Sequence, residues 1–447
     1  MNRDTICAIA TPTGGAISII RISGPKALSI VASVCRKNFI NKKRFLSSIT
    51  DQDGIVIDEA IISVFYGPYS YTGEDSAEIN CHGSRYIAQR IIDLLIEKGC
   101  RMALPGEYTQ RAFINGKLDL SQAEAVADLI ASTNKATHQM AMSQLRGHFS
   151  SELTQLRDQL LHLTSLMELE LDFSEHEDLE FANRNDLLNL AHKIEKKINQ
   201  LATSFRTGQA LKEGIPVAIV GKTNVGKSTL LNRLLHEERA IVSDIHGTTR
   251  DTIEDTIDIH GIQFRFIDTA GFRQTTDTIE QIGIERTLAT IEKARIVLWL
   301  YDKSPTEEEI ADMANRCQGR ILIPVRNKID LGNAFPYTEI SSHPTINISA
   351  KQGQGIENLE EAIYKSADIP DFTENDVIIT NARHYEALIH ASANLKRVVQ
   401  GIENSLSSDI IAEDLRLVLH DLGEITGGTI TSQETLNNIF KNFCVGK

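Results

Sequence analysis

The stretch Gly221-Lys222-Thr223-Asn224-Val225-Gly226-Lys227-Ser228 has the glycine, lysine and serine spacing of a phosphate-binding P-loop. An apolar run, residues 217–220, precedes it, and Thr229-Leu230-Leu231 opens a helical pattern directly after it. In this strand–loop–helix context, backbone N–H groups surround phosphate oxygens, and the helix dipole favours their negative charge. We therefore expect a nucleoside triphosphate here, with Lys227 on the β- and γ-phosphates and Ser228 on Mg²⁺.

Three later segments indicate which base is bound. They are Asp268-Thr269-Ala270-Gly271 after residues 264–267, Asn327-Lys328-Ile329-Asp330 after residues 321–325, and Ser349-Ala350-Lys351 after another short apolar run. Asp268 can hold Mg²⁺ through water, and Gly271 can sense the γ-phosphate. The Asp330 carboxylate can accept hydrogen bonds from both N1–H and the amine of guanine, a pair of donors that adenine lacks. The ordered set predicts GTP, bound by residues 224–229, 268–271, 327–330 and 349–351, and residues 243–249 are expected to line the same nucleotide site.

Hydrolysis needs a group other than the usual glutamine. Ras-like proteins carry glutamine directly after the Asp-Thr-Ala-Gly segment to orient the attacking water, and Phe272 stands at that position here. Glu280 lies in the polar stretch 274–281 and could orient the water instead. From the residues alone this assignment stays open, because a surface glutamate is more often simply solvated.

A monovalent cation is the second open candidate for promoting hydrolysis. Asn224 could supply an oxygen ligand to such an ion, which would replace an arginine finger. The surrounding loop could add backbone carbonyls, and it consists of Ser243-Asp244-Ile245-His246-Gly247-Thr248-Thr249. The Thr249 hydroxyl is a candidate Mg²⁺ ligand. Arg250 could itself be an arginine finger, but Asp251 beside it makes a local ion pair equally expected.

The chain changes its pattern three times along its length. Residues 1–118 carry short β-type runs such as 16–22 and 61–66, after which a helical pattern starts at Ser121, spaced from Glu124 like a capping box. Between residues 215 and 366, apolar β-type runs alternate with helical segments, which is typical of a parallel sheet covered on both faces. We predict an α/β plus α fold, in which a P-loop GTPase domain (213–370) is inserted into a helical domain (119–212 and 371–447). An α+β N-terminal domain (1–118) precedes both.

Composition limits the class of protein. The 447 residues are 41% hydrophobic and carry a net charge of −14, which disfavours non-specific binding to a polyanion. A basic run at 36–44 and an acidic run at 168–180 are most simply solvated faces. The six cysteines form no Cys-x-x-Cys pair, the N-terminus lacks a signal-peptide layout, and no stretch is apolar enough to cross a bilayer. These features predict a cytosolic protein without a zinc module or a membrane anchor.

Several longer motifs lie outside the nucleotide segments. They are Asp4-Thr5-Ile6 with Ala10-Thr11-Pro12; Tyr71-Thr72-Gly73-Glu74-Asp75 with Glu78 and His82-Gly83; Pro105-Gly106-Glu107-Tyr108-Thr109 with Arg111 and residues 115–130; residues 422–427; and the closing Phe443-Cys444-Val445-Gly446-Lys447. With these motifs the whole chain resembles the MnmE (TrmE) family of bacterial tRNA-modification GTPases.

The resemblance implies roles for the flanking regions. The N-terminal domain is expected to resemble a folate-binding fold and to mediate dimerisation. Arg21, Glu78, Lys117 and Lys447 match the family's contacts to a formyl-tetrahydrofolate. The implied partner is MnmG, an FAD protein, in a heterotetramer. The complex is expected to add a carboxymethylaminomethyl-type group to C5 of the tRNA wobble uridine, with a one-carbon unit from a tetrahydrofolate derivative.

The resemblance also bears on hydrolysis. It implies a potassium-activated GTPase in which Asn224, Ser243, Ile245 and Thr248 bind K⁺ and Glu280 is the catalytic residue. The family usually has proline at Thr223, a small residue or proline at His246, and isoleucine at Val445, so the ion loop departs slightly from the pattern. Cys444 is a candidate functional thiol near the folate site, against a packed or inert one; a prenylation signal is excluded by the glycine and lysine that end the chain.

Two rival readings remain at this stage. One is a ribosome-assembly or RNA-chaperone GTPase that acts purely as a binding switch. Such proteins carry a second GTPase domain or a KH-type module, neither of which the sequence contains. The other is a GTP-regulated scaffold, which predicts no pterin binding.

Overall fold

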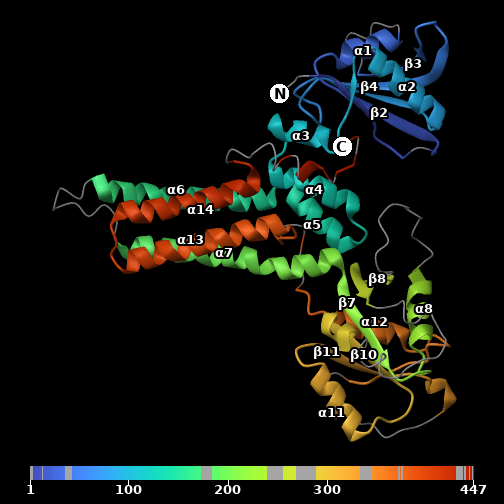
Figure 1. The fold of residues 1–447 in the computed structure, drawn as a ribbon, viewed down its shortest axis with the longest axis vertical. Helices are drawn as coiled ribbons and strands as arrows, with labels where there is room; N and C mark the ends of the chain where they lie inside the picture. The colour runs from blue at the N-terminus through green and yellow to red at the C-terminus, as the bar shows by residue number, and fades with distance from the viewer. Residues whose placement is uncertain are drawn as a thin grey trace. The chain divides into compact units, whose positions relative to one another are not determined.

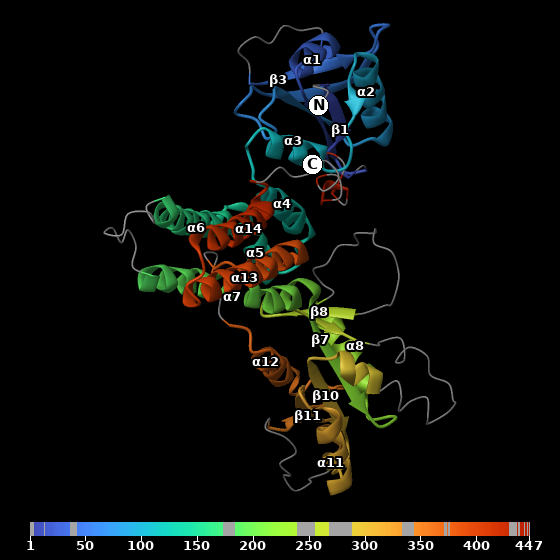
Figure 2. The same ribbon diagram turned by 60° about the vertical axis from the view of Figure 1, so that its left-hand side comes forward.

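The computed structural model describes most of the chain. The described residues are 4–12, 14–35, 43–172, 184–238, 255–267, 288–332, 344–370, 373, 376–428, 436, 439–441, 443, 444 and 446. They form two compact units, one from residues 1–131, 141–199 and 386–447, the other from 132–140 and 200–385. Figures 1 and 2 show the elements of each unit from two directions. None of the described helices is both long enough and apolar enough to span a membrane.

The first unit begins with a six-stranded sheet in the order β3-β4-β5-β2-β1-β6. Its strands are β1 (Ile6–Ile9), β2 (Ile17–Ser23), β3 (Arg44–Thr50), β4 (Val56–Phe65), β5 (Ser76–His82) and β6 (Arg101–Met102). Every described pairing is antiparallel except β1 with β6. Helices α1 (Ala27–Cys35) and α2 (Arg85–Glu97) lie on one face, over an apolar core. The short helix α3 (Glu107–Ile114) follows β6.

Alternation along β2 and β5 places two charged residues on the other face of the sheet. Ile20 and Ile22 point into the core, so Arg21 between them points away from it. On β5, Ala77 and Ile79 are buried in the same way, and Glu78 lies between them. The register pairs Arg21 directly with Glu78. Alternation and strand register together therefore bring two of the expected site residues side by side.

The helical part of this unit packs amphipathic helices side by side. It contains α4 (Leu120–Ala131), α5 (Lys135–Leu145), α6 (His148–Asp172), α7 (Arg184–Glu213), α13 (Ala382–Glu403) and α14 (Ser408–Thr426), of which α5, α7 and α13 also contribute residues to the second unit. In both views α6 lies along α14. The buried positions of α6 recur at helical spacing and are Phe149, Leu153, Leu156, Leu160, Leu163 and Met167.

The predicted start of α4 is wrong by two residues. Asp119, not Ser121, caps the helix: its Oδ1 accepts the Gln122 amide at 2.9 Å, and the Gln122 Oε1 accepts the Asp119 amide at 3.0 Å. This reciprocal pair is a capping box shifted along the chain. Ser121 instead donates its hydroxyl to Asp119 at 2.8 Å.

The second unit is built on a mainly parallel sheet in the order β12-β11-β10-β7-β9-β8. Its strands are β7 (Ile215–Gly221), β8 (Asp255–Ile259), β9 (Ile262–Phe266), β10 (Ile296–Tyr301), β11 (Ile321–Arg326) and β12 (Ile346–Asn347). Its described helices include α8 (Lys227–Glu238), α11 (Glu307–Arg316), α12 (Ile356–Ser366) and the short 3-10 helix η1 (Ile329–Leu331). Separate apolar clusters cover the two faces, which confirms the predicted architecture. The sequence did not predict the antiparallel edge strand β8, which pairs with β9 through a tight turn.

The domain boundaries drawn from the sequence stay predictions. Residues 132–140, 200–212 and 376–385, expected in the helical domain, group with the second unit. The segment 132–140 makes this contact through backbone, because Ala136 donates its amide to the Gly261 carbonyl at 3.0 Å.

Candidate functional site

The P-loop lies at the carboxyl end of β7 and leads into α8. Two of its glycines have no room for a side chain. A Cβ on Gly221 would lie 2.3 Å from the Leu300 carbonyl oxygen, and a Cβ on Gly226, at φ +104°, would lie 2.3 Å from the Asn327 amide nitrogen. The motif therefore needs glycine at both positions for close approach of neighbouring chain segments.

Lys227 folds back over the loop that precedes it. Its Nζ donates to the carbonyl of Gly221 at 2.6 Å and to that of Lys222 at 2.8 Å. Burial lowers the pKa of the Lys227 ammonium, because the charged form loses water. A phosphate bound in the loop would stabilise the charged Lys227 ammonium, because its negative charge offsets the loss of water around that group.

Asn327 joins three of the predicted segments. Its side chain is buried; Nδ2 donates to the Val225 carbonyl at 2.8 Å, and Oδ1 accepts the Ala350 amide at 3.0 Å. These partners lie 102 and 23 positions away in the sequence. The structure thus brings residues 224–229, 327–330 and 349–351 to one edge of the sheet.

Asp330 and the 349–351 loop are held by further contacts. Ser349 donates its hydroxyl to Asp330 Oδ1 at 2.7 Å, which fixes the carboxylate. Arg233 of α8 donates to the carbonyls of Lys351 at 2.8 Å and Ala350 at 3.3 Å. The sequence analysis missed Arg233, because it lies on a helix outside every motif.

Several predicted site residues lie outside the described residues. They are Ser243, Asp244, Ile245, His246, Gly247, Thr248, Thr249, Arg250, Asp251, Asp268, Thr269, Ala270, Gly271, Phe272, Glu280 and Lys447.

A second cluster surrounds Arg21 on the outer face of the N-terminal sheet. The guanidinium donates to Glu78 Oε1 through Nε at 3.0 Å and Nη2 at 2.8 Å, and Nη1 donates to the Gly446 carbonyl at 3.0 Å. Its carbon lies 5.8 Å from the centroid of the Tyr71 ring and 5.7 Å from that of Tyr108. These aromatic faces favour the cation. Two of the expected contacts, Arg21 and Glu78, therefore meet, and the Gly446 carbonyl lies beside them, while Lys447 lies outside the described residues.

Lys117 and Cys444 lie in the same unit as Arg21. Lys117 donates its Nζ to the Pro68 carbonyl at 3.1 Å. Cys444 is exposed, and its carbonyl accepts the Gly106 amide at 3.3 Å. Cys81 is buried instead, and burial together with the nearby Asp58 carboxylate raises the pKa of its thiol to about 11. Across the described part of the chain, no cluster of three metal-ligating side chains occurs.

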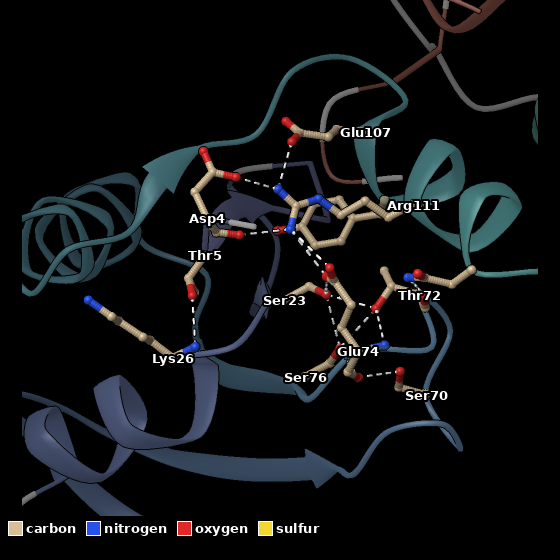
Figure 3. A network of polar contacts seen from close by, with 12 residues as sticks. Asp4, Thr5, Ser23, Lys26, Ser70, Thr72, Glu74, Ser76, Glu107 and Arg111 are labelled. Carbon is tan, nitrogen blue, oxygen red and sulfur yellow. Dashed lines mark hydrogen bonds and ion pairs between the residues drawn. The ribbon is translucent and has the colours of Figure 1, made fainter. Parts of the chain in front are cut away.

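A buried polar network holds the segment that carries Tyr71, and Arg111 is its centre (Figure 3). The Arg111 side chain is 11% exposed and forms ion pairs with three carboxylates: Asp4 at 2.7 Å, Glu107 at 2.9 Å and Glu74 at 3.2 Å. Glu74 also accepts the Ser23 hydroxyl at 2.8 Å. The network ties β1, the loop before β5 and α3 together. The sequence singled out Arg111 only as part of a family motif, without a role.

Known proteins resemble the chain over its full length. A family model for the GTP-binding protein TrmE N-terminus matches residues 5–117, and one for the MnmE helical domain matches residues 120–444. A tRNA modification GTPase MnmE from Phocaeicola vulgatus is 54% identical and covers 100% of the chain and 99% of that protein. Proteins of the same name from Bacteroides thetaiotaomicron and Flavobacterium johnsoniae are 52% and 50% identical, each over 100% of both chains.

The matched residues include the P-loop unit as well as both flanking regions. Identity of 50% or more over essentially complete chains shows the family of the protein. The chain belongs to the MnmE (TrmE) family of tRNA modification GTPases.

Proposed function

We propose that the protein binds and hydrolyses GTP as part of tRNA wobble-uridine modification. The observation that carries this proposal is Asn327, whose buried amide joins the P-loop to the 349–351 loop. A phosphate site and a guanine-selective carboxylate, Asp330, thereby share one edge of the sheet. The described relatives named tRNA modification GTPases support the same activity.

In this proposal, Lys227 binds the β- and γ-phosphates and Ser228 and Thr249 hold Mg²⁺. Mg²⁺ supplies charge neutralisation at the phosphates. Asp330 selects guanine, with Ser349 fixing one of its oxygens at 2.7 Å. The described donors fit such a ligand, because the Lys227 ammonium lies beside the P-loop backbone and the loop leads into the N-terminus of α8.

We further propose that K⁺ promotes hydrolysis at Asn224, with Glu280 orienting the attacking water. Asn224 lies in the P-loop and has a left-handed backbone conformation, at φ +61°. Its backbone therefore follows neither the strand β7 before it nor the helix α8 after it. We expect full-length protein to hydrolyse GTP at least tenfold faster in KCl than in NaCl at equal ionic strength. Equal rates in the two salts would contradict the cation assignment, and unchanged turnover of Glu280→Ala would contradict that of Glu280.

The N-terminal domain is proposed to bind a tetrahydrofolate derivative that supplies the one-carbon unit. Support comes from the Arg21–Glu78 pair, whose guanidinium also lies 5.8 and 5.7 Å from the ring centroids of Tyr71 and Tyr108 and donates to the Gly446 carbonyl. A guanidinium and a carboxylate on one surface suit the amide-like edge of a pterin, which offers both donors and acceptors. Isothermal titration with formyl-tetrahydrofolate should give binding to wild type and at least tenfold weaker binding to Glu78→Gln. Absence of binding to wild type would refute the folate assignment.

The partners follow from the same family membership. We propose a homodimer through the N-terminal domain, a heterotetramer with the FAD protein MnmG, tRNA as substrate, and a cytoplasmic location. The dimer is supported by exposed apolar residues on the N-terminal sheet: Leu46 and Ile61, paired across β3 and β4, are 62% and 44% exposed, and Phe65 is 40% exposed. Exposed large apolar side chains grouped on two neighbouring strands are typical of an interface.

A further inference from the structure

Lys328 of the guanine-selective segment contacts two parts of the protein at once. Its Nζ donates to the Asn224 carbonyl of the P-loop at 2.7 Å and to Asp302 Oδ2 at 2.7 Å. The two side chains of the ion pair are about one-third exposed, at 34% for Lys328 and 32% for Asp302. Asp302 belongs to none of the nucleotide motifs and has no role in the function proposed above.

The sheet register explains why Asp302 reaches this place. Asp302 directly follows β10, which runs parallel to β11, and Tyr301 pairs with Arg326 at the ends of the two strands. The Asn327 amide then donates to the Tyr301 carbonyl at 2.9 Å, which extends the pairing by one residue. Lys328 follows in a left-handed conformation, at φ +64°, which turns the chain out of the strand direction. Asp302 and Lys328 therefore leave adjacent strands at the same edge.

A lysine needs such a partner to hold a single position. Its ammonium sits on a stem of four carbons with many rotamers, and one carbonyl acceptor in contact with water does little to restrict it. A charge-assisted hydrogen bond to a carboxylate is about twice as strong as a neutral one. Asp302 thus favours the rotamer in which Lys328 also reaches Asn224.

We propose that Asp302 is a positioning residue that sets the affinity for guanine nucleotides by holding Lys328 on the P-loop carbonyl. Through this bridge the phosphate-binding loop and the base-binding segment keep one relative geometry before the nucleotide arrives. Preorganisation of this kind improves affinity, because the ordering cost is met within the free protein. The inference rests on the proposed GTP binding at this edge.

The bridge predicts a change in affinity rather than in the chemical step. Lys328 contacts the loop backbone and the base-binding segment, and it is placed on neither the transferred phosphate nor the attacking water. Asp302→Asn in the full-length protein should raise the KM for GTP and the Kd for GDP about tenfold, the usual effect of losing a hydrogen bond to a charged group. The kcat should stay within about twofold, and Asp302→Glu should recover most of the affinity.

Two comparisons separate positioning from a merely structural role. Asp312→Asn is the matched control, because Asp312 forms an exposed ion pair with Arg316 at 2.8 Å on α11 of the same unit. This variant should leave the KM for GTP and the Kd for GDP unchanged. In a Lys328→Met background, Asp302→Asn should have no further effect on KM, because Asp302 acts through Lys328.

The results that would overturn the inference are distinct. An unchanged KM in Asp302→Asn, or a fall in kcat at constant KM, would refute it. So would an Asp302→Asn substitution that raises KM as much in the Lys328→Met background as in the wild-type protein. Failure of the wild-type protein to bind GDP would instead refute the proposed function. Nucleotide binding by wild type, measured first with a fluorescent GDP, keeps these two failures apart.

Discussion

Replacing Gly226 by alanine should weaken guanine-nucleotide binding about a hundredfold. The new Cβ would lie 2.3 Å from the Asn327 amide nitrogen, on a residue whose φ of +104° already excludes most side chains. Left-handed backbone costs an L-residue about 1–2 kcal/mol. Moving Asn327 aside would sacrifice hydrogen bonds to Val225 and Ala350, each worth about 1 kcal/mol. Together these effects amount to about 3 kcal/mol, or two factors of ten in Kd.

The measurement is a fluorescent-GDP titration of the full-length variant beside a matched glycine. Gly319 has a similar positive φ of +75°, but a Cβ there meets no atom within 4 Å among the described residues. Gly319→Ala should therefore cost a little stability and leave the Kd unchanged. If the two variants lose affinity equally, the hydrogen bonds of Asn327 to Val225 and Ala350 do not position the nucleotide-binding segments.

Removing the Arg111 guanidinium should destabilise the first unit by about 3 kcal/mol. Arg111→Met leaves Glu74 without its arginine and deprives Asp4 and Glu107 of one of their two. Breaking a buried ion-pair network by deleting one partner costs about 3–5 kcal/mol of folding stability. We expect the lower end of this range, because Arg101 still pairs with Asp4 and Glu107 in the variant. Arg90→Met is the matched control, since Arg90 pairs with Asp51 at 3.7 Å and is 40% exposed; it should change stability by less than about 1 kcal/mol.

The chain offers an internal reporter for this experiment. Its single tryptophan, Trp299, lies on β10 of the second unit, so tryptophan fluorescence follows that unit, while hydrogen exchange in β1 and β5 follows the first. In Arg111→Met, the amides of β1 and β5 should lose their protection from exchange at a lower urea concentration than in wild type. The midpoint of the Trp299 fluorescence transition should stay unchanged. A shift of both transitions together, or of neither, would contradict the assignment of Arg111 to the first unit's network.

The same network should make the first unit sensitive to acid. The pKa of Asp4 is lowered, mainly by its hydrogen bond from Arg101. Burial opposes ionisation of Glu107, but hydrogen bonds from Arg101, the Leu104 amide and Arg111 outweigh it and lower that pKa as well. A carboxyl with a lowered folded-state pKa stabilises the fold above its unfolded pKa of about 4, and this stability is lost as the pH falls through the folded value. Arg111→Met should accordingly lose less stability than wild type below about pH 4.

Much of the nucleotide site could be predicted because its residues are in local motifs. The P-loop and the 327–330 and 349–351 segments each follow an apolar run, and parallel strands end at a common edge, so their meeting follows from pattern and topology. Asp302 could not be found in this way, because its contact depends on which residues of β10 and β11 pair. Strand register across a parallel pair is a tertiary property, with no local signal at Asp302 itself.

The same division holds in the N-terminal domain. The alternation around Arg21 and Glu78 predicts that both leave the core, but not that Tyr71, Tyr108 and Gly446 gather around the guanidinium. At the start of α4, local reasoning chose Ser121 because serine is a good cap. Asp119 is an equally good cap, and its glutamine three residues on completes the box. Two adjacent signals of similar strength cannot be ranked without the packing that chooses between them.

The bond from Arg21 to the Gly446 carbonyl joins residues 425 positions apart. Ribosomes add about 5–20 residues per second, so Arg21 is added to the chain roughly 20 to 85 s before Gly446 is added. During synthesis the N-terminal sheet can fold before the Gly446 carbonyl, the acceptor of this bond, has been made. A nascent chain that does not yet include residue 446 would therefore carry a folded sheet in which Arg21 lacks this hydrogen bond. Formation of this bond therefore requires that synthesis has passed residue 446.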